Sequence, residues 1–302
     1  MPRIVGRFAP SPTGPLHLGS LVAAVGSWLF ARAAGGSWLV RMEDLDTPRV
    51  VPGAAEEILR TLERYGLTWD GEVVLQSRRL EHYDAALEIL LMDGNAFACA
   101  CSRADLARAA SAPDRADPIA NGLYPGTCRG GLPPGKEARA IRFRVPAGRI
   151  FLEDRVFGPL SEDVAVAVGD IVVRRADGPY AYQLAVVVDD AEQGVTEVVR
   201  GADLLSSTAR QITLQRALKV PTPSYAHLPL VLGPDGRKLG KRDGALPLAG
   251  QDEERVRTAL ASALRILGQV PVDGSPREML DEALRRFDPR AIPREPHRVS
   301  ES

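Results

Sequence analysis

Residues 7–20 of the chain read RFAPSPTGPLHLGS. Three prolines and Gly14 exclude regular secondary structure between Ala9 and Leu16. A short apolar strand, residues 3–6, precedes this loop. Apolar residues at helical spacing follow it: Leu18, Leu21, Val22, Val25, Trp28 and Leu29. The segment therefore predicts a strand, a rigid loop and a helix with one apolar face.

The start of this helix carries His17 and Gly19. Unpaired backbone N–H groups and the positive end of the helix dipole gather at such a point, which favours a bound phosphate. Gly19 lets a ligand approach the backbone because it has no side chain. The competing interpretation is a proline-rich turn in which His17 caps or packs. A rigid loop, a histidine and a glycine together at a helix start favour the phosphate site.

Length and composition limit the class of protein. The chain has 302 residues, 45% of them apolar, which suffices for one large domain with an insertion or for two domains. The net charge of −1 means that a nucleic-acid site would have to be a local patch. The apolar runs are too short for a bilayer and the N-terminus does not resemble a signal peptide, so we expect a cytoplasmic protein without membrane contact.

Strands and helices alternate after the first helix. Residues 38–42 predict a buried strand, and residues 55–65 and 83–92 predict amphipathic helices. This order indicates a parallel sheet with helical crossovers, which binds ligands beyond the carboxyl ends of its strands. Glu43 follows its strand directly, so we expect it to face the pocket. For Asp44 and Asp46 a solvated acidic turn is an equal alternative.

All three cysteines, Cys99, Cys101 and Cys128, lie within one 30-residue segment. The clustering favours a structural metal site, most plausibly zinc, over three reduced and partly buried thiols. The residues alone leave the fourth ligand open between water, His82 and an oxygen donor. Residues 130–136, GGLPPGK, fit the frame of a P-loop, but Glu137 occupies the Ser/Thr position and a strand follows instead of a helix. A P-loop is therefore rejected.

The middle of the chain reads as an insertion of short strands between two halves of the sheet. Residues 141–145, 150–152, 164–168 and 171–174 are the expected strands. Buried structure resumes at residues 180–190, and residues 195–199 form a further strand. Thr208 and Gln211 are expected to form a capping box. Residues 228–232 are the last expected strand.

A basic segment, Arg237–Arg242, follows that strand with the sequence RKLGKR. A solvated basic loop is the ordinary interpretation. However, the chain has only four lysines, Lys136, Lys219, Lys238 and Lys241, and two of them lie here. We interpret the segment as a phosphate clamp. Two helices follow, one capped by Asp252 and one opened by a capping box at Ser275, and the arginines after them predict a solvated tail.

These motifs together resemble the class I aminoacyl-tRNA synthetases in their glutamyl form. Residues 15–20, PLHLGS, stand at the first signature, with Ser20 in place of a histidine, and KLGKR resembles the second signature with Gly240 in place of a serine. The resemblance implies a Rossmann-like α/β catalytic domain that uses ATP with Mg²⁺. It assigns ATP binding to His17, Gly19, Lys238 and Lys241, with His17 and Lys241 as the catalytic residues.

The same resemblance implies L-glutamate as the amino-acid substrate. Its pocket would comprise Arg7, Ala9, Ser11, Glu43, Tyr182 and Arg200. Arg7 would pair with the side-chain carboxylate of glutamate, and Glu43 would attract its α-ammonium group.

Two features resemble the glutamyl-queuosine branch of this family: the run RGADLLSST at residues 200–208, and a Cys-x-Cys pair followed by Tyr-x-x-x-Cys. The branch implies Tyr124 as the fourth zinc ligand and transfer of glutamate to queuosine in the anticodon loop of tRNA(Asp). The alternatives are a truncated glutamyl-tRNA synthetase that charges a tRNA 3′ end, a small-molecule ligase or nucleotidyltransferase, and a non-catalytic RNA- or amino-acid-binding paralogue.

The expected organisation has three parts. Residues 1–97 and 180–248 would form the two halves of the Rossmann-like catalytic domain. Residues 98–179 would form an inserted, zinc-bearing connective subdomain. Residues 249–302 would form a short C-terminal helical segment, without an anticodon-binding domain. We expect a monomer.

Overall fold

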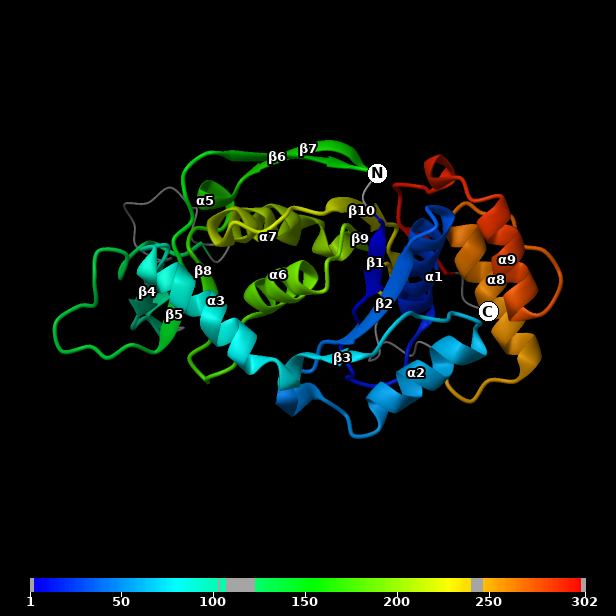
Figure 1. The fold of residues 1–302 in the computed structure, drawn as a ribbon, viewed down its shortest axis with the longest axis horizontal. Helices are drawn as coiled ribbons and strands as arrows, with labels where there is room; N and C mark the ends of the chain where they lie inside the picture. Colours follow the sequence, from blue (N-terminus) through cyan, green and yellow to red (C-terminus); the bar gives the residue numbers. More distant parts are fainter. Residues whose placement is uncertain (1–2, 103, 107–122, 240–246, 300–302) are drawn as a thin grey trace.

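The computed structural model describes residues 3–102, 104–106, 123–239 and 247–299 (Figure 1). The chain is elongated in this view. Helices α8 (Glu253–Ile266) and α9 (Pro276–Arg285) lie at one end. Strands β4 (Ala96–Cys99), β5 (Ala140–Phe143) and β8 (Ile171–Arg174) lie at the other, with the parallel strands between the two ends. No helix in the described part of the chain is long and apolar enough to cross a membrane.

Two parallel arrangements of strands form the centre. Strands β1 (Val5–Phe8), β2 (Ser37–Met42) and β3 (Val74–Leu75) pair in that order. Strands β9 (Glu197–Gly201) and β10 (Ser224–Leu228) pair with each other, and β10 also pairs in parallel with β6 (Arg149–Asp154). Val5 and Thr196 join the two groups, since Val5 N donates to Thr196 Oγ1 at 2.9 Å and Thr196 N donates to Val5 O at 3.0 Å. The expected Rossmann-like α/β fold is confirmed.

Helix α1 (Leu18–Ala33) covers this centre because its apolar side chains face inward, as its sequence period predicts. Trp28 from α1 and Trp38 from β2 are fully buried in one core cluster that also includes residues of α8 and α9. Helix α2 (Ala54–Arg64) packs Ile58 and Leu62 into the same core. Short 3₁₀ helices follow β2, at Thr47–Arg49, and β3, at Gln76–Arg78.

The middle segment forms a separate antiparallel sheet. Its strands are β4 (Ala96–Cys99), β5 (Ala140–Phe143) and β8 (Ile171–Arg174), in the order β4-β5-β8, after helix α3 (Leu80–Met92). Strands β6 (Arg149–Asp154) and β7 (Gly158–Asp163) form a hairpin. The strand expected at residues 164–168 is wrong. Val164–Ala167 form helix α5, because Asp163 caps it by accepting a hydrogen bond from Val166 N.

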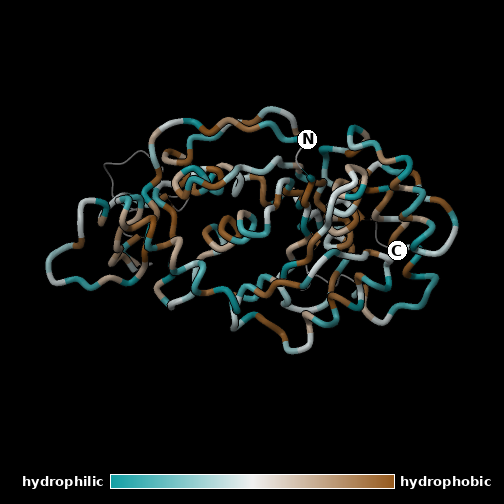
Figure 2. Tube along the Cα trace, viewed as in Figure 1, coloured by the Kyte–Doolittle hydropathy of each residue, from teal (hydrophilic) through white to brown (hydrophobic). Residues whose placement is uncertain are grey.

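Two buried helices then complete the second core cluster. Helix α6 (Tyr182–Glu192) changes from apolar to hydrophilic along its length (Figure 2). A 3₁₀ helix at Ala202–Leu204 leads into α7 (Leu205–Leu218). The capping box expected at Thr208 is wrong. Helix α7 begins at Leu205, so Thr208 lies buried inside it. The hydroxyl oxygen of Thr208 accepts a hydrogen bond from Arg200.

The last part of the chain contains two helices and a strand. Helices α8 (Glu253–Ile266) and α9 (Pro276–Arg285) have the predicted caps at Asp252 and Ser275. The strand expected at residues 228–232 is interrupted, since β10 ends at Leu228 and β11 (Val231–Leu232) belongs to another sheet. After a 3₁₀ helix at Pro289–Ala291, β12 (His297–Arg298) pairs in parallel with β11. The arginines of this segment are exposed, as predicted for a solvated tail, but the backbone of residues 297–298 is held in a strand.

Candidate active site

Two adjoining cavities lie where β1 and β9 end. The smaller has a volume of about 370 Å³ and the larger about 1160 Å³. Phe8, Gly201, Asp203 and Lys238 line both. The smaller cavity brings together every residue that the sequence assigned to glutamate: Arg7, Ala9, Ser11, Glu43, Tyr182 and Arg200.

The proline-rich loop is held by backbone hydrogen bonds to the segment that follows β2. Glu43 N donates to Pro10 O at 2.9 Å, and Val51 N donates to Pro12 O at 2.9 Å. The first bond places Glu43 beside the loop that carries Ala9 and Ser11. The loop therefore needs no regular secondary structure to be fixed, which agrees with its three prolines.

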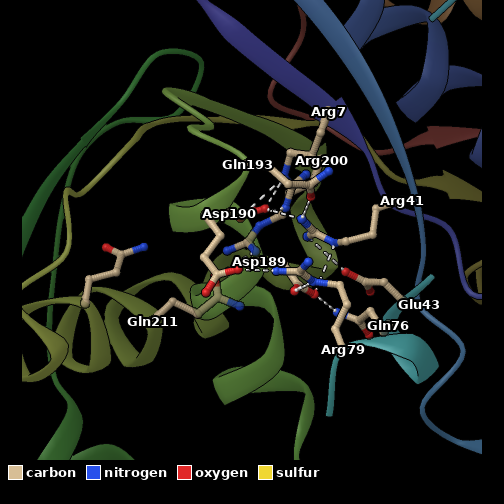
Figure 3. Close-up of polar contacts among 12 residues, drawn as sticks. Arg7, Arg41, Glu43, Gln76, Arg79, Asp189, Asp190, Gln193, Arg200 and Gln211 are labelled. Carbon is tan, nitrogen blue, oxygen red and sulfur yellow. Dashed lines mark hydrogen bonds and ion pairs between the residues drawn. The ribbon is translucent and has the colours of Figure 1, made fainter. Parts of the chain in front are cut away.

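Arg7 and Glu43, which line the smaller cavity, belong to a cluster of alternating charges (Figure 3). Arg7 Nε lies 3.2 Å from Asp190 Oδ1, and Arg41 Nη1 lies 2.8 Å from the same oxygen. Arg41 Nη2 lies 3.4 Å from Glu43 Oε1. The Arg7 and Arg41 side chains are at least 97% buried, so solvent screens these pairs little. Asp190 thus holds Arg7 and Arg41 together, and Arg41 in turn reaches Glu43.

The two carboxyl groups respond differently to this environment. Burial raises the pKa of Glu43, and the attraction of Arg41 and Arg7 offsets only part of that effect. Burial also acts on Asp190, but Arg7 and Arg41 together hold its pKa below the usual range. The anionic form of Asp190 is therefore favoured, whereas Glu43 is the more easily protonated group.

A second carboxylate, Asp189, connects this cluster to three neighbouring side chains. Its side chain is fully buried and accepts hydrogen bonds from Gln76 Nε2 at 2.8 Å, Arg79 Nε at 2.6 Å and Tyr83 Oη at 2.8 Å. Gln193 accepts a further bond from Arg41 at 2.7 Å. Adjacent residues of α6 thus anchor groups from β2, the 3₁₀ turn after β3, and α3. The sequence showed these two aspartates only as the end of a buried run.

Arg200 is held by a chain of buried polar groups that sequence reasoning missed. Its Nε donates to His227 Nε2 at 3.1 Å, and His227 Nδ1 donates to Asp154 Oδ2 at 2.6 Å. Burial lowers the pKa of His227, which favours the neutral imidazole that can accept from Arg200. Thr208 and Gln211 accept from the remaining guanidinium nitrogens at 2.8 Å each.

The larger cavity is lined by the start of α1. His17 occupies the N-cap position in an extended conformation, and Gly19 and Ser20 follow it on the cavity wall. Lys238 also lines this cavity and forms an ion pair with Asp203. Gly240 and Lys241, the other part of the second signature, lie outside the described residues.

The three cysteines lie together in a small third cluster. Their sulfur atoms are all within 4.8 Å of one another, an arrangement that could hold a metal ion. Tyr124 Oη lies 3.6 Å from Cys99 Sγ and accepts a hydrogen bond from Cys128 N at 2.8 Å. Burial and the neighbouring thiols raise the pKa of Cys101 to about 11. His82 contacts Glu192 on α6 instead, with its Nδ1 2.8 Å from the carboxylate.

Comparison with known proteins agrees with this geometry. Residues 3–290 match the family model described as tRNA synthetases class I (E and Q), catalytic domain. The chain is 59% identical over 298 residues to the glutamyl-Q tRNA(Asp) synthetase of Geobacter sulfurreducens, covering 97% of this chain and 94% of that protein. The chain belongs to the glutamyl-Q tRNA(Asp) synthetase family.

Another member of the glutamyl-Q tRNA(Asp) synthetase family, from Thiobacillus denitrificans, is 56% identical and covers 97% of this chain and 96% of its own length. Among solved structures, a glutamate-tRNA synthetase from Elizabethkingia anophelis is 30% identical with a TM-score of 0.80. That match covers 99% of this chain and 68% of the solved one. The family resemblance expected from the two signatures is confirmed.

Proposed function

We propose that this protein activates L-glutamate with ATP and transfers the glutamyl group to the queuosine base in the anticodon loop of tRNA(Asp). The observation that carries the proposal is a pair of adjoining cavities. One is lined by Arg7, Glu43 and Arg200, and the other by the start of α1. An amino acid and a triphosphate placed in them would meet at the shared wall.

The smaller cavity suits glutamate because its charges are of both signs. Arg7, whose side chain is oriented by its ion pair with Asp190, would pair with the side-chain carboxylate of glutamate. Glu43 would attract the α-ammonium group. Arg200 and Tyr182 would complete the pocket, with Ala9 and Ser11 on the proline-rich loop. A solved relative, the glutamate tRNA ligase of Elizabethkingia meningosepticum in complex with its amino acid, shares this fold at a TM-score of 0.80.

The larger cavity would take ATP with its Mg²⁺. His17 and Gly19 line it at the positive end of α1, where backbone N–H groups favour a phosphate, and Lys238 would supply a further positive charge. The α-carboxylate of glutamate attacks the α-phosphorus of ATP, and pyrophosphate leaves. This step requires positioning and charge stabilisation but no covalent enzyme intermediate. Lys241 is assigned to the same role by its signature. In the second step, a hydroxyl of queuosine attacks the adenylate carbonyl and AMP leaves.

A structural Zn²⁺ is the second part of the proposal. Cys99, Cys101 and Cys128 would supply three sulfur ligands and Tyr124 the fourth, through its oxygen. Three clustered thiolates with one more donor match the tetrahedral preference of zinc. The metal would connect the end of strand β4, at Cys99, to Tyr124 and Cys128, which follow later in the chain.

We also propose the three-part organisation expected from the sequence. In the sequence, strands β4, β5 and β8 come after β1–β3 and before β9–β10, which supports an insertion at residues 98–179. Residues 249–302 follow the catalytic halves. A monomer remains our expectation, and sedimentation equilibrium would test it.

The deciding experiment supplies ATP and labelled glutamate to tRNA(Asp) prepared with and without queuosine. We expect label only on the queuosine-bearing tRNA, and the label should survive periodate oxidation of the 3′ end. Label on the 3′ end of tRNA(Glu), with none on tRNA(Asp), would instead establish a truncated glutamyl-tRNA synthetase. No pyrophosphate exchange with glutamate and ATP would point to a non-catalytic paralogue.

A further inference from the structure

The C-terminal strand β12 lies directly against the segment that carries Lys238. His297 N donates to Leu230 O at 2.8 Å, and Val299 N donates to Leu232 O at 3.0 Å. These bonds flank the parallel pairing of β12 with β11. Residues more than 60 positions later in the chain thus hold the backbone just before the second signature.

The opposite edge of β11 is paired with the signature itself. Leu239 N donates to Val231 O at 2.8 Å, and Leu232 forms an antiparallel bridge with Lys238. Residues 231–232 are therefore the middle of a small three-stranded arrangement, with β12 on one side and residues 238–239 on the other. A displacement of the middle strand would move both edges together.

This small sheet is not a continuation of the main one. Strand β10 ends at Leu228, and Pro229 has no N–H group with which to extend the β9–β10 ladder. The segment that follows therefore needs another partner. That partner is β12, and the residues just before it are held in place. Arg294 Nε donates to Val156 O at 2.7 Å, and Ile292 is buried in the main core.

The paired segment lines the larger cavity. Leu230, Val231 and Leu239 face that cavity but not the smaller one, whereas Lys238 lines both. We propose that residues 294–299, here called the C-terminal strap, position the nucleotide side of the active site by holding β11 and, through β11, Lys238. This inference rests on the proposed ATP site. It assigns a positioning role, not a catalytic one, to His297 and Val299 through their backbone.

The test compares two substitutions at one position. His297→Pro removes the N–H group that donates to Leu230 O, whereas His297→Ala removes only an exposed side chain. We expect His297→Pro to raise the KM for ATP in pyrophosphate exchange about fivefold, the value of one net hydrogen bond, while the KM for glutamate changes less than about twofold. His297→Ala should match the original protein.

Hydrogen exchange without any ligand supplies a readout independent of activity. In His297→Pro the amide of Leu239, which donates to Val231 O, should lose protection, while amides of β9 keep theirs. A chain that ends at Glu295 removes β12 but keeps Arg294, and it should behave as His297→Pro does.

Three results would overturn the strap: equal rises in both KM values, unchanged KM values, or unchanged protection of Leu239. If the original protein shows no pyrophosphate exchange, the proposed function fails, and the Leu239 amide alone then decides whether the strap holds this segment.

Discussion

At the scale of single residues, Asp190 links the two arginines beneath the smaller cavity. Asp190→Asn would remove the negative charge shared by Arg7 and Arg41 and leave the buried guanidinium of Arg7 without that carboxylate. Breaking a buried pair in this way costs about 3 kcal/mol of stability. Because Arg7 would also lose its orientation, we expect the KM for glutamate to rise at least about tenfold, measured by pyrophosphate exchange.

The matched control is Asp177→Asn. Asp177 pairs with Arg175 on the surface, where both side chains are more than one-third exposed, so its loss should cost less than about 1 kcal/mol. Equal effects of the two substitutions on the KM for glutamate would show that Asp190 does not orient Arg7.

Glu43 gives a prediction about pH. Its pKa is raised above the ordinary value of 4.5 because burial outweighs the attraction of Arg41 and Arg7. Glu43 is ionised above that raised pKa and loses its charge as the pH falls through it. We therefore expect the KM for glutamate to rise on acidification, starting at a higher pH than an exposed carboxyl would cause. Glu43→Gln should have a high KM that lacks this dependence, and identical pH profiles for the two proteins would contradict the assignment.

At the scale of elements, α1 packs closely on β10 at Gly26. A Cβ atom at Gly26 would lie 2.5 Å from Leu228 Cδ1 and 3.4 Å from Leu267 Cδ2, and both leucines are fully buried. Gly26→Ala should therefore destabilise the protein by about 1 kcal/mol net, although helix propensity alone predicts a gain of about that size. Denaturant unfolding measures the difference.

A double-mutant cycle separates the two effects. Leu228→Val removes a methylene group next to the added methyl, so the double variant should be more stable than the sum of the single changes predicts. Simple additivity would mean that Gly26 is not packed against β10 in this way.

The same scale shows what the sequence can and cannot reveal. Helices α1, α2, α3 and α8 were predictable because each carries a local apolar period or a cap that the chain itself displays. Residues 164–168 were wrongly predicted as a strand because their alternating Val and Ala fit the period of a strand. Only the cap at Asp163 favours a helix. Pro229 marks the end of β10 locally, but the new pairing partner of β11, strand β12, lies far along the chain.

The site was predictable to a similar degree. Arg7, Glu43, Tyr182 and Arg200 share one cavity as the resemblance implied. The groups that hold them come from distant elements: Asp154 from β6 and His227 from β10 support Arg200 through contacts 27 and 73 positions apart. No local pattern marks such a chain of hydrogen bonds, since each member resembles an ordinary polar residue in its own segment.

At the scale of the whole molecule, the described residues form three apolar clusters of unequal size. Two are large and surround the parallel strands, and the third contains only Phe97, Cys99, Tyr124 and Cys128 as buried members. So few buried apolar side chains supply little stability, and we therefore expect the third cluster to need additional bonds, such as those of the proposed metal. The two cavities of the candidate site are lined by residues of the other parts of the chain.

This division predicts a separable effect of metal loss. Cys128→Ala should abolish binding of about one Zn²⁺ per chain and loosen the segment around Tyr124, seen as faster hydrogen exchange there. Pyrophosphate exchange with glutamate and ATP should stay within about threefold, because the cavities do not share this cluster. Removing the metal from the unchanged protein with a chelator should reproduce both results. If pyrophosphate exchange instead falls in proportion to zinc content, the metal supports the catalytic halves directly and the third cluster is not an independent unit.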